Sequence, residues 1–319
     1  MISSKIFAQA PKVPDLALKT APKKKLLKKD KLSFFSFISE NNNVKKLMDI
    51  SLSEKTSPEA IHQKIKEAYN SIKSSKPSKQ AIIFLGNTDA GKSTLCNYIA
   101  GIPLKAINIR VHGLVIELLN ENILEAYSKI GHHTVSQTTN PIELRDEDGN
   151  SIWDAPGFGD SRGANVDIPN CYMIKTLFQN TEKCKIVFVV DQDTVKDQNR
   201  SQTFIKRINN IIELFSDVSK IEKSVFLAVT KVSKVGFEKD SDLCEFIGDM
   251  IQEHPEFNET QRKVLKLFME EQRVILFHKP EREGIIPSSD RDIYSLRTPY
   301  EPPTAKFNSF PSQKLEKLT

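Results

Sequence analysis

The segment Gly86-Asn-Thr-Asp-Ala-Gly-Lys-Ser-Thr94 decides the fold of this 319-residue chain. It matches the pattern G-x-x-x-x-G-K-[ST], follows the apolar run 81–85 and precedes a helical pattern over 92–100. Glycine tolerates the backbone angles that curl such a loop, so that successive N–H groups point inward at an anion. The positive end of the following helix faces the same place. The segment therefore predicts a loop that cradles phosphate groups.

Several side chains of this loop have an expected role. Lys92 can reach the β- and γ-phosphates of a nucleotide, and the Ser93 hydroxyl can ligate Mg²⁺. Asp89 is unusual because it puts a carboxylate near a polyanion, and it either points to solvent or helps to bind a cation. The predicted nucleotide-binding residues of the loop are Gly86, Asn87, Thr88, Asp89, Ala90, Gly91, Lys92, Ser93 and Thr94.

A second carboxylate comes from the segment Trp153-Asp-Ala-Pro-Gly-Phe158. Asp154 ends a predicted strand and can hold Mg²⁺ through a water, while Gly157 offers a backbone N–H to the γ-phosphate. The polar segment 136–141 precedes it and fits a loop that γ-phosphate and Mg²⁺ would order. Thr139, with Thr138 as the alternative, would complete the metal shell. The predicted metal ligands are Ser93, Thr139 and Asp154, and the predicted catalytic residues are Lys92, Thr139 and Gly157.

From residue 80 to about 279 the chain resembles the translation-factor-related class of P-loop GTPases. The segments around Asp154 and Thr138 are most similar to its Era-like, septin and immunity-associated branches. In that class the motif [NT]-K-x-D recognises the base, and here it would be Thr230-Lys-Val-Ser233, with the loop at about His278 and Lys279 also touching the base. The resemblance implies a G domain that binds GTP or GDP with Mg²⁺ and hydrolyses GTP. It assigns base binding to Thr230, Lys231 and Ser233.

The chain departs from the class at two positions. Ser233 replaces the carboxylate that accepts hydrogen bonds from guanine, and losing such a bond costs about 10- to 150-fold in preference for guanine. Lys231 would still cover the base ring, and the spacing of Glu238 and Asp240 does not support either as a substitute. Phe158 stands where switch GTPases carry the glutamine that orients water. We therefore expect slow hydrolysis, on the order of 10⁻⁴ s⁻¹ without help.

Help with hydrolysis could come from a partner or from a second copy across the nucleotide face. Arg162 is the candidate residue to act in trans, although a lone arginine more often makes a surface salt bridge. Two other functions stay open. One is a P-loop ATPase whose Mg²⁺ carboxylate is Asp191, at the end of the apolar run 187–190, and the other is a nucleotide-binding scaffold with little hydrolysis. Competition between GTP and ATP, and single-turnover hydrolysis, separate these functions.

The remaining pattern alternates strand and helix. Short apolar runs predict strands buried in a parallel sheet, and Asp146-Glu-Asp-Gly-Asn150 predicts a hairpin turn. The fold class is therefore α/β, a three-layer P-loop NTPase sandwich with a mostly parallel sheet. Residues 102–131 are long for a connection and are expected to hold an extra strand and a helix. The expected strands are 81–85, 113–118, 142–145, 151–153, 185–190, 224–230 and 273–277, and the expected helices are 92–100, 122–130 and 197–215.

Basic charge is concentrated in the first 80 residues. They carry 17 lysines, no arginine and 7 acidic residues, a charge of +10, and the remainder carries 29 basic and 34 acidic residues, a charge of −5. This distribution argues against a nucleic-acid groove in the main domain. The lysine run 23–31 beside Phe34, Phe35 and Phe37 fits an anionic membrane surface or a protein partner, a nuclear import signal, or a solvated disordered tail.

We expect a basic disordered tail (1–40), a helical extension and linker (41–79), the G domain (80–285) and an irregular tail (286–319). The extension is expected to hold a helix over 58–74 with one apolar face. The four cysteines lie far apart, which favours reduced thiols, and the chain has no signal-peptide pattern or long apolar run. These features predict a cytoplasmic protein, with peripheral membrane contact as an alternative.

Overall fold

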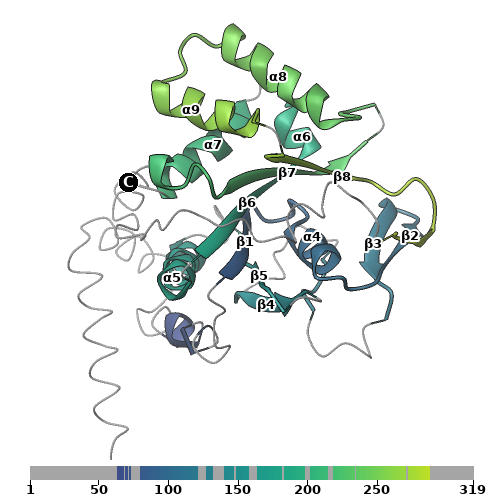
Figure 1. The fold of residues 1–319 in the computed structure, drawn as a ribbon. Helices are drawn as coiled ribbons and strands as arrows, with labels where there is room; N and C mark the ends of the chain where they lie inside the picture. The colour runs from purple at the N-terminus through teal and green to yellow at the C-terminus, as the bar shows by residue number, and fades with distance from the viewer. Residues whose placement is uncertain are drawn as a thin grey trace, which may run out of the picture. The chain divides into compact units, whose positions relative to one another are not determined.

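The computed structural model describes residues 63–67, 69, 70, 72, 80–120, 127–131, 140–146, 149–157, 164–181, 183–197, 202–214, 218–233, 235–270 and 272–287. The chain divides into two units, residues 1–40 and 41–319, and all the described residues belong to the second. That unit holds a six-stranded sheet and a separate three-stranded sheet (Figure 1). No helix of the described residues is long and apolar enough to cross a membrane.

The six-stranded sheet has the order β4-β5-β1-β6-β7-β8. All neighbouring strands pair in parallel except β4 and β5, which form the predicted antiparallel hairpin. Because parallel strands run the same way, their carboxyl ends meet at one edge, which is where ligands bind in open α/β sheets. The strands are β1 (Gln80–Gly86), β4 (Ile142–Arg145), β5 (Ser151–Asp154), β6 (Lys183–Asp191), β7 (Val225–Val232) and β8 (Val274–His278).

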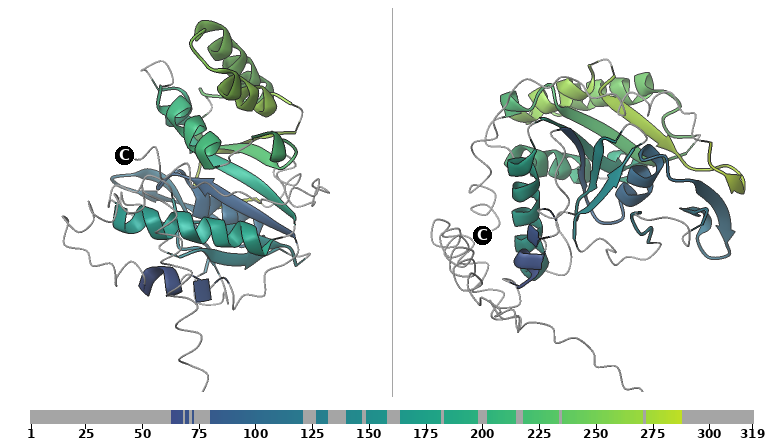
Figure 2. Two further views of the ribbon diagram at one scale, coloured as in Figure 1. Left: turned by 90° about the vertical axis from the view of Figure 1, so that its left-hand side faces the viewer. Right: turned by 60° about the horizontal axis from the view of Figure 1, so that its bottom comes forward.

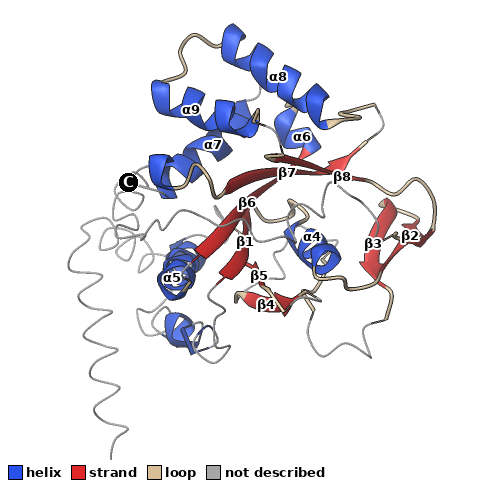
Figure 3. Ribbon diagram, viewed as in Figure 1, coloured by secondary structure: helices blue, strands red, loops and turns tan. Residues whose placement is uncertain are grey.

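Helices cover both faces of this sheet, which makes three layers (Figures 1 and 3). Strand β1 shows why, since Ile83 and Leu85 enter one apolar cluster while Ile82 and Phe84 enter the other. The first cluster is covered by α5 (Ala164–Asn180), α7 (Gln202–Leu214), α8 (Asp240–Glu253) and α9 (Glu259–Phe268), and the second by α4 (Lys92–Ile99). In the left view of Figure 2, α5 runs alongside the strands. The predicted fold class is confirmed.

A second, antiparallel sheet has the order β3-β2-β9 and consists of β2 (Leu104–Ile109), β3 (Gly113–Leu118) and β9 (Gly284–Ile285). Strand β3 confirms the predicted extra strand, whereas β2 and β9 were not predicted. The buried Leu104 and Leu118 join the same apolar cluster as α4. The second sheet therefore shares the layer of α4.

The prediction of a helix over 122–130 is wrong for its last part, because residues 127–130 are irregular. The buried Asn97 of α4 explains this. Its amide donates to Ser128 O at 2.7 Å and accepts from Ser128 N at 2.9 Å. A side chain thus satisfies the backbone groups that a helix would have paired. Residues 121–126 lie outside the described part of the chain.

Two other predicted helices are observed, one of them with different bounds. The helix expected over 197–215 is observed as α7, from Gln202 to Leu214, and Asp197 precedes it and accepts a hydrogen bond from the Thr203 hydroxyl. The described residues of the expected helix over 58–74 are helical. Its Ile65 and Ile72 are buried, and Ile72 joins the core cluster that contains Ile83. The extension therefore packs on the main domain.

Candidate nucleotide-binding site

The loop between β1 and α4 has the backbone that its glycines allow. Gly86 has φ 150°, and a Cβ there would lie 2.2 Å from the carbonyl oxygen of Val189 on β6. Gly91 has φ 76° and caps α4, and Asp89 has φ 65°, a left-handed conformation that is uncommon outside glycine. The first helical residue is Lys92, so the positive end of α4 faces the loop. Sequence and backbone together form a phosphate-sized cradle.

Lys92 lies inside this cradle. Its side chain is buried, and its Nζ donates to the backbone oxygen of Asn87 at 2.6 Å. A buried ammonium needs acceptors, and a carbonyl oxygen supplies one that a phosphate oxygen could replace. The Lys92 side chain is therefore already positioned over the loop.

The Ser93 hydroxyl donates to Asp154 Oδ2 at 2.7 Å. The two residues are 61 positions apart in the sequence, and the parallel pairing of β1 with β5 brings them together, since Phe84 lies opposite Asp154. Asp154 is fully buried. A hydroxyl and a carboxylate at the mouth of a phosphate loop are the hard oxygen donors that Mg²⁺ prefers, so these residues fit the metal.

Gly157 lies against the loop, next to Thr88. A Cβ at Gly157 would lie 2.6 Å from the backbone nitrogen of Thr88 and 2.9 Å from its Oγ1. The buried Asn170 of α5 donates to Gly157 O at 3.1 Å and fixes this contact. The Thr88 hydroxyl is buried, and it makes no hydrogen bond within the described part of the chain. A phosphate oxygen is an acceptor that would satisfy it.

The Thr230 side chain ties β7 to the loop. Its hydroxyl donates to Ala90 O at 2.7 Å, and Val190 O lies at 3.2 Å. Lys231 follows with φ 54°, and its Nζ lies 3.2 Å from Asp89 Oδ2. This ion pair is partly exposed, with 38% of the Lys231 side chain and 58% of the Asp89 side chain accessible. Asp89 therefore faces a protein cation.

Ser233 pairs with a residue that the sequence reasoning missed. Gln192, at the start of the short helix α6 (Gln192–Val195), donates from Nε2 to Ser233 Oγ at 3.1 Å and accepts from Ser233 N at 3.0 Å. A Cβ at Gly236 would lie 1.7 Å from Gln192 Oε1, so the loop after β7 closes over this amide. The sequence could have indicated Gln192, because this residue directly follows an apolar strand of the parallel sheet. The carboxyl ends of such strands meet at one edge, where ligands bind.

Arg207 of α7 was also missed. With the Asn87 amide oxygen turned toward the guanidinium, Asn87 accepts from Arg207 Nε at 2.9 Å and from Nη1 at 2.7 Å. Burial lowers the pKa of Arg207, and Asp191 opposes this effect. An arginine on an amphipathic helix carries no sequence signal for contact with a loop more than a hundred residues earlier.

Asp191 has a structural task at the end of β6. Its carboxylate accepts a hydrogen bond from Thr194 N at 2.7 Å and caps α6. Among the described residues, the carboxylate that contacts Ser93 is that of Asp154. This geometry disfavours Asp191 as the metal carboxylate of an ATPase.

Cys96 lies one turn into α4, close to Asp154 and Lys92. Burial raises the pKa of its thiol well above the ordinary value, and the negative charge of Asp154 raises it further. The thiol therefore stays protonated, and we assign it to packing.

Several candidate residues lie outside the described part of the chain. They are Thr138, Thr139, Phe158 and Arg162, together with the basic tail 1–40 and residues 288–319. Glu238 and Asp240, considered as substitutes for the missing carboxylate, do not line the pocket beside Lys231 in the described structure.

The strand order, the loop after β1 and the carboxylate at the end of β5 are those of the three-layer α/β fold of P-loop NTPases. No family model and no curated protein matches the chain.

Solved structures that resemble the chain include Toc33 from Arabidopsis thaliana in complex with Mg²⁺ and GMPPNP. That match has 15% identity, a TM-score of 0.41, and covers 76% of this chain and 91% of the other. Era in complex with MgGDPNP and 16S ribosomal RNA matches with 15% identity and a TM-score of 0.28. A variant of Era from Aquifex aeolicus bound to GDP.AlF4⁻ matches with 17% identity and a TM-score of 0.24. Both Era matches cover 66% of this chain, which spans 60% of those proteins.

Proposed function

We propose that the chain binds GTP and GDP with Mg²⁺ and hydrolyses GTP slowly, as a nucleotide-controlled switch or a self-assembling GTPase. The observation that carries the proposal is the hydrogen bond of 2.7 Å between the Ser93 hydroxyl and Asp154, at the mouth of the loop that begins at Gly86. Mg²⁺ bound there would neutralise charge on the phosphates. Thr139, which lies outside the described residues, is proposed as a further ligand.

The other residues of the loop have distinct tasks in this proposal. Lys92 exchanges its bond to Asn87 O for bonds to the β- and γ-phosphates, which are stronger acceptors because they are charged. Thr230 holds the loop through Ala90 O while the nucleotide binds. Lys231 covers the base ring with its aliphatic chain, as in the class that the sequence resembles.

Gly157 is proposed to sense the γ-phosphate. In the structure its backbone lies directly against Thr88, at a distance that leaves no room for a Cβ. A γ-phosphate bound beside Thr88 would offer the Gly157 N–H a charged acceptor while Gly157 keeps its place against Thr88. A diphosphate would leave that N–H without this acceptor. This difference between the two nucleotides is the basis of a switch.

Hydrolysis is proposed to be slow because Phe158, in the position of the water-orienting glutamine, has no hydrogen-bonding group. An added arginine can raise such rates by about 10³ to 10⁵. It would come from a partner or from Arg162 of a second copy across the nucleotide face. The basic tail 1–40 is proposed to contact an anionic membrane surface or a protein partner, with the main domain in the cytoplasm.

The test is binding and single-turnover hydrolysis of GTP by the full chain, with Mg²⁺ or with EDTA, and with ATP as competitor. We expect GTP to bind in a Mg²⁺-dependent way, to outcompete ATP and to be hydrolysed slowly. Equal or tighter binding of ATP would contradict the GTPase proposal. Tight GTP binding without turnover would favour the scaffold alternative, and a rate per molecule that does not change with protein concentration would exclude self-activation.

A further inference from the structure

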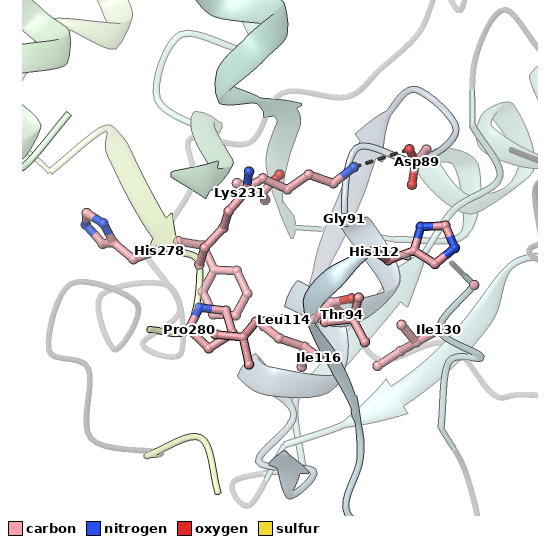
Figure 4. Close-up of a pocket in the computed structure, with 15 residues that line it drawn as sticks. Asp89, Gly91, Thr94, His112, Leu114, Ile116, Ile130, Lys231, His278 and Pro280 are labelled. Carbon is pink, nitrogen blue, oxygen red and sulfur yellow. Dashed lines mark ion pairs between the residues drawn. The ribbon is translucent and has the colours of Figure 1, made fainter. Parts of the chain in front are cut away.

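A pocket of about 310 Å³ lies between the phosphate loop, the ends of β7 and β8, and strand β3. That volume is at the lower end for small-molecule sites, roughly 300–1,000 Å³. Figure 4 shows Leu114 and Ile116 of β3 on one side of the pocket and His278 and Pro280 on another, with Lys231 reaching toward Asp89. Apolar walls beside a phosphate loop suit the flat ring of a base.

The cationic side chains of this pocket are hydrogen-bond donors. Lys231 and Lys279 are cationic, and His112 and His278 also line the pocket. Among the described residues that line the pocket, Asp89 carries the only carboxylate. Its Oδ2 lies 3.2 Å from Lys231 Nζ. Donors select acceptor atoms, and a 6-oxopurine presents O6 and N7 as acceptors, whereas adenine presents an amino group at position 6. The pocket therefore favours a 6-oxopurine ring.

Ser233 directly follows the end of β7 that lines this pocket. Thr230 and Lys231 line it, and Val232 is paired with His278, which lines it too. Lys279 N donates to Val232 O at 2.8 Å, which fixes the two strand ends together. Ser233 therefore follows the pocket-lining residues at the sequence position where the class that the sequence resembles has a carboxylate.

Ser233 can offer a base only an uncharged hydrogen-bonding group, its hydroxyl. Gln192 uses both ends of its amide on Ser233, one on the side-chain oxygen and one on the backbone nitrogen. Gln192 is itself buried, and the backbone of Gly236 closes over it. The pair is therefore held in place. Guanine differs from hypoxanthine only by its 2-amino group, a donor that gains most from an anionic acceptor.

We propose that this site binds 6-oxopurine nucleotides without reading the 2-amino group, so that GTP and ITP bind alike. The neutral Ser233, where a carboxylate would be needed to read that amino group, accounts for this specificity. The inference rests on the proposed function, since it concerns the base of the same nucleotide.

The experiment measures the affinities of the full chain for GTP, ITP and ATP with Mg²⁺. We expect GTP and ITP to differ by less than about tenfold, the range of one neutral hydrogen bond, and both to bind more tightly than ATP. A preference for GTP over ITP of more than about tenfold would overturn the inference and leave the proposed function standing. Absence of binding by all three nucleotides would contradict the proposed function itself.

Two variants at one position sharpen the result. Ser233→Asp adds the anionic acceptor and is expected to raise the preference for GTP over ITP by about 10- to 150-fold. Ser233→Ala, the matched control, removes the hydroxyl without adding charge and should leave that preference unchanged. Melting temperatures report whether each variant folds. If Ser233→Asp does not fold, the ratio of the wild-type affinities for GTP and ITP decides the inference. A fall in the ratio on Asp89→Asn would mean that Asp89 reads the 2-amino group, which would overturn the assignment to Ser233.

Discussion

The two ends of the proposed nucleotide site are built differently. The phosphate end (Gly86–Thr94 with Asp154 and Gly157) contains the buried Lys92 and Asp154, and a Cβ at Gly86 or Gly157 would clash with neighbouring backbone. The base end (Thr230–Ser233 with Gln192, His278 and Lys279) is partly exposed and has a neutral pair where a carboxylate would read guanine. We therefore expect most of the nucleotide affinity to come from the phosphate end and only weak selection from the base end.

The largest effect is expected from Gly86→Ala at the phosphate end. The new Cβ would lie 2.2 Å from the carbonyl oxygen of Val189, and both residues belong to adjacent strands of the central sheet. We expect a loss of about 3 kcal/mol in the free energy of unfolding and no detectable nucleotide binding. Urea denaturation and titration with a fluorescent GTP analogue measure the two effects.

Gly284→Ala is the control for that variant. Gly284 also has a positive φ, 139°, but a Cβ there meets nothing within 4 Å. It should show only the smaller cost of the backbone angle and should keep nucleotide binding. Equal destabilisation by the two variants would mean that the close approach of Gly86 to Val189 is unimportant.

Next in size is Asp154→Asn, which tests the metal at the phosphate end. If Asp154 holds Mg²⁺ through water, we expect GTP affinity to fall about 10- to 100-fold in Mg²⁺ and to stay unchanged in EDTA. Asp191→Asn is the matched control, because asparagine still caps α6 and the metal should be unaffected. The opposite pattern, with only Asp191→Asn sensitive to Mg²⁺, would favour the ATPase alternative.

A moderate effect is expected from Gly157→Ala, which tests the proposed sensing of the γ-phosphate. Its Cβ would lie 2.6 Å from Thr88 N, so the segment must shift and its N–H would miss the γ-phosphate. We expect GTP affinity to fall about tenfold, the value of one charged hydrogen bond, with little change for GDP. Gly149→Ala, at an open turn of the β4–β5 hairpin, serves as control. Equal losses for both nucleotides would contradict the switch.

The smallest effect is expected from Asp89→Asn, at the boundary between the two ends. The Asp89–Lys231 pair is partly exposed, so its removal should change the free energy of unfolding by less than about 1 kcal/mol. Triphosphate affinity should rise, on the order of threefold at low salt, because a negative charge near the phosphates is removed. The gain should shrink as salt is added. A loss of affinity would show that Asp89 helps to bind a cation.

The phosphate end could be predicted from sequence because its motif is contiguous and its chemistry is local. A loop with Gly86, Lys92 and Ser93 between an apolar run and a helix has few other interpretations. The alternation of Ile82 with Ile83 into opposite clusters likewise follows from the continuous apolar run. The parallel sheet then places Asp154 beside Ser93.

Contacts made by tertiary packing could not be predicted. Arg207 reaches Asn87 from the side of an amphipathic helix, and the two-residue strand β9 has no periodicity to detect. The irregular residues 127–130 follow from one buried amide, that of Asn97, which overrides the helical pattern. Gln192 was within reach of prediction, since it follows a strand whose neighbours end at the same edge.

The central claim is that the loop from Gly86 to Thr94 binds a nucleoside triphosphate through Lys92. Its most direct test is the equilibrium dissociation constant for GTP with Mg²⁺, measured by calorimetry on the wild type and on Lys92→Ala, with circular dichroism confirming that both are folded. The account predicts at least about a 100-fold loss of affinity in Lys92→Ala, because the variant would lose the proposed charged contacts of the buried ammonium with two phosphates. Equal affinity of the two proteins for GTP would contradict it.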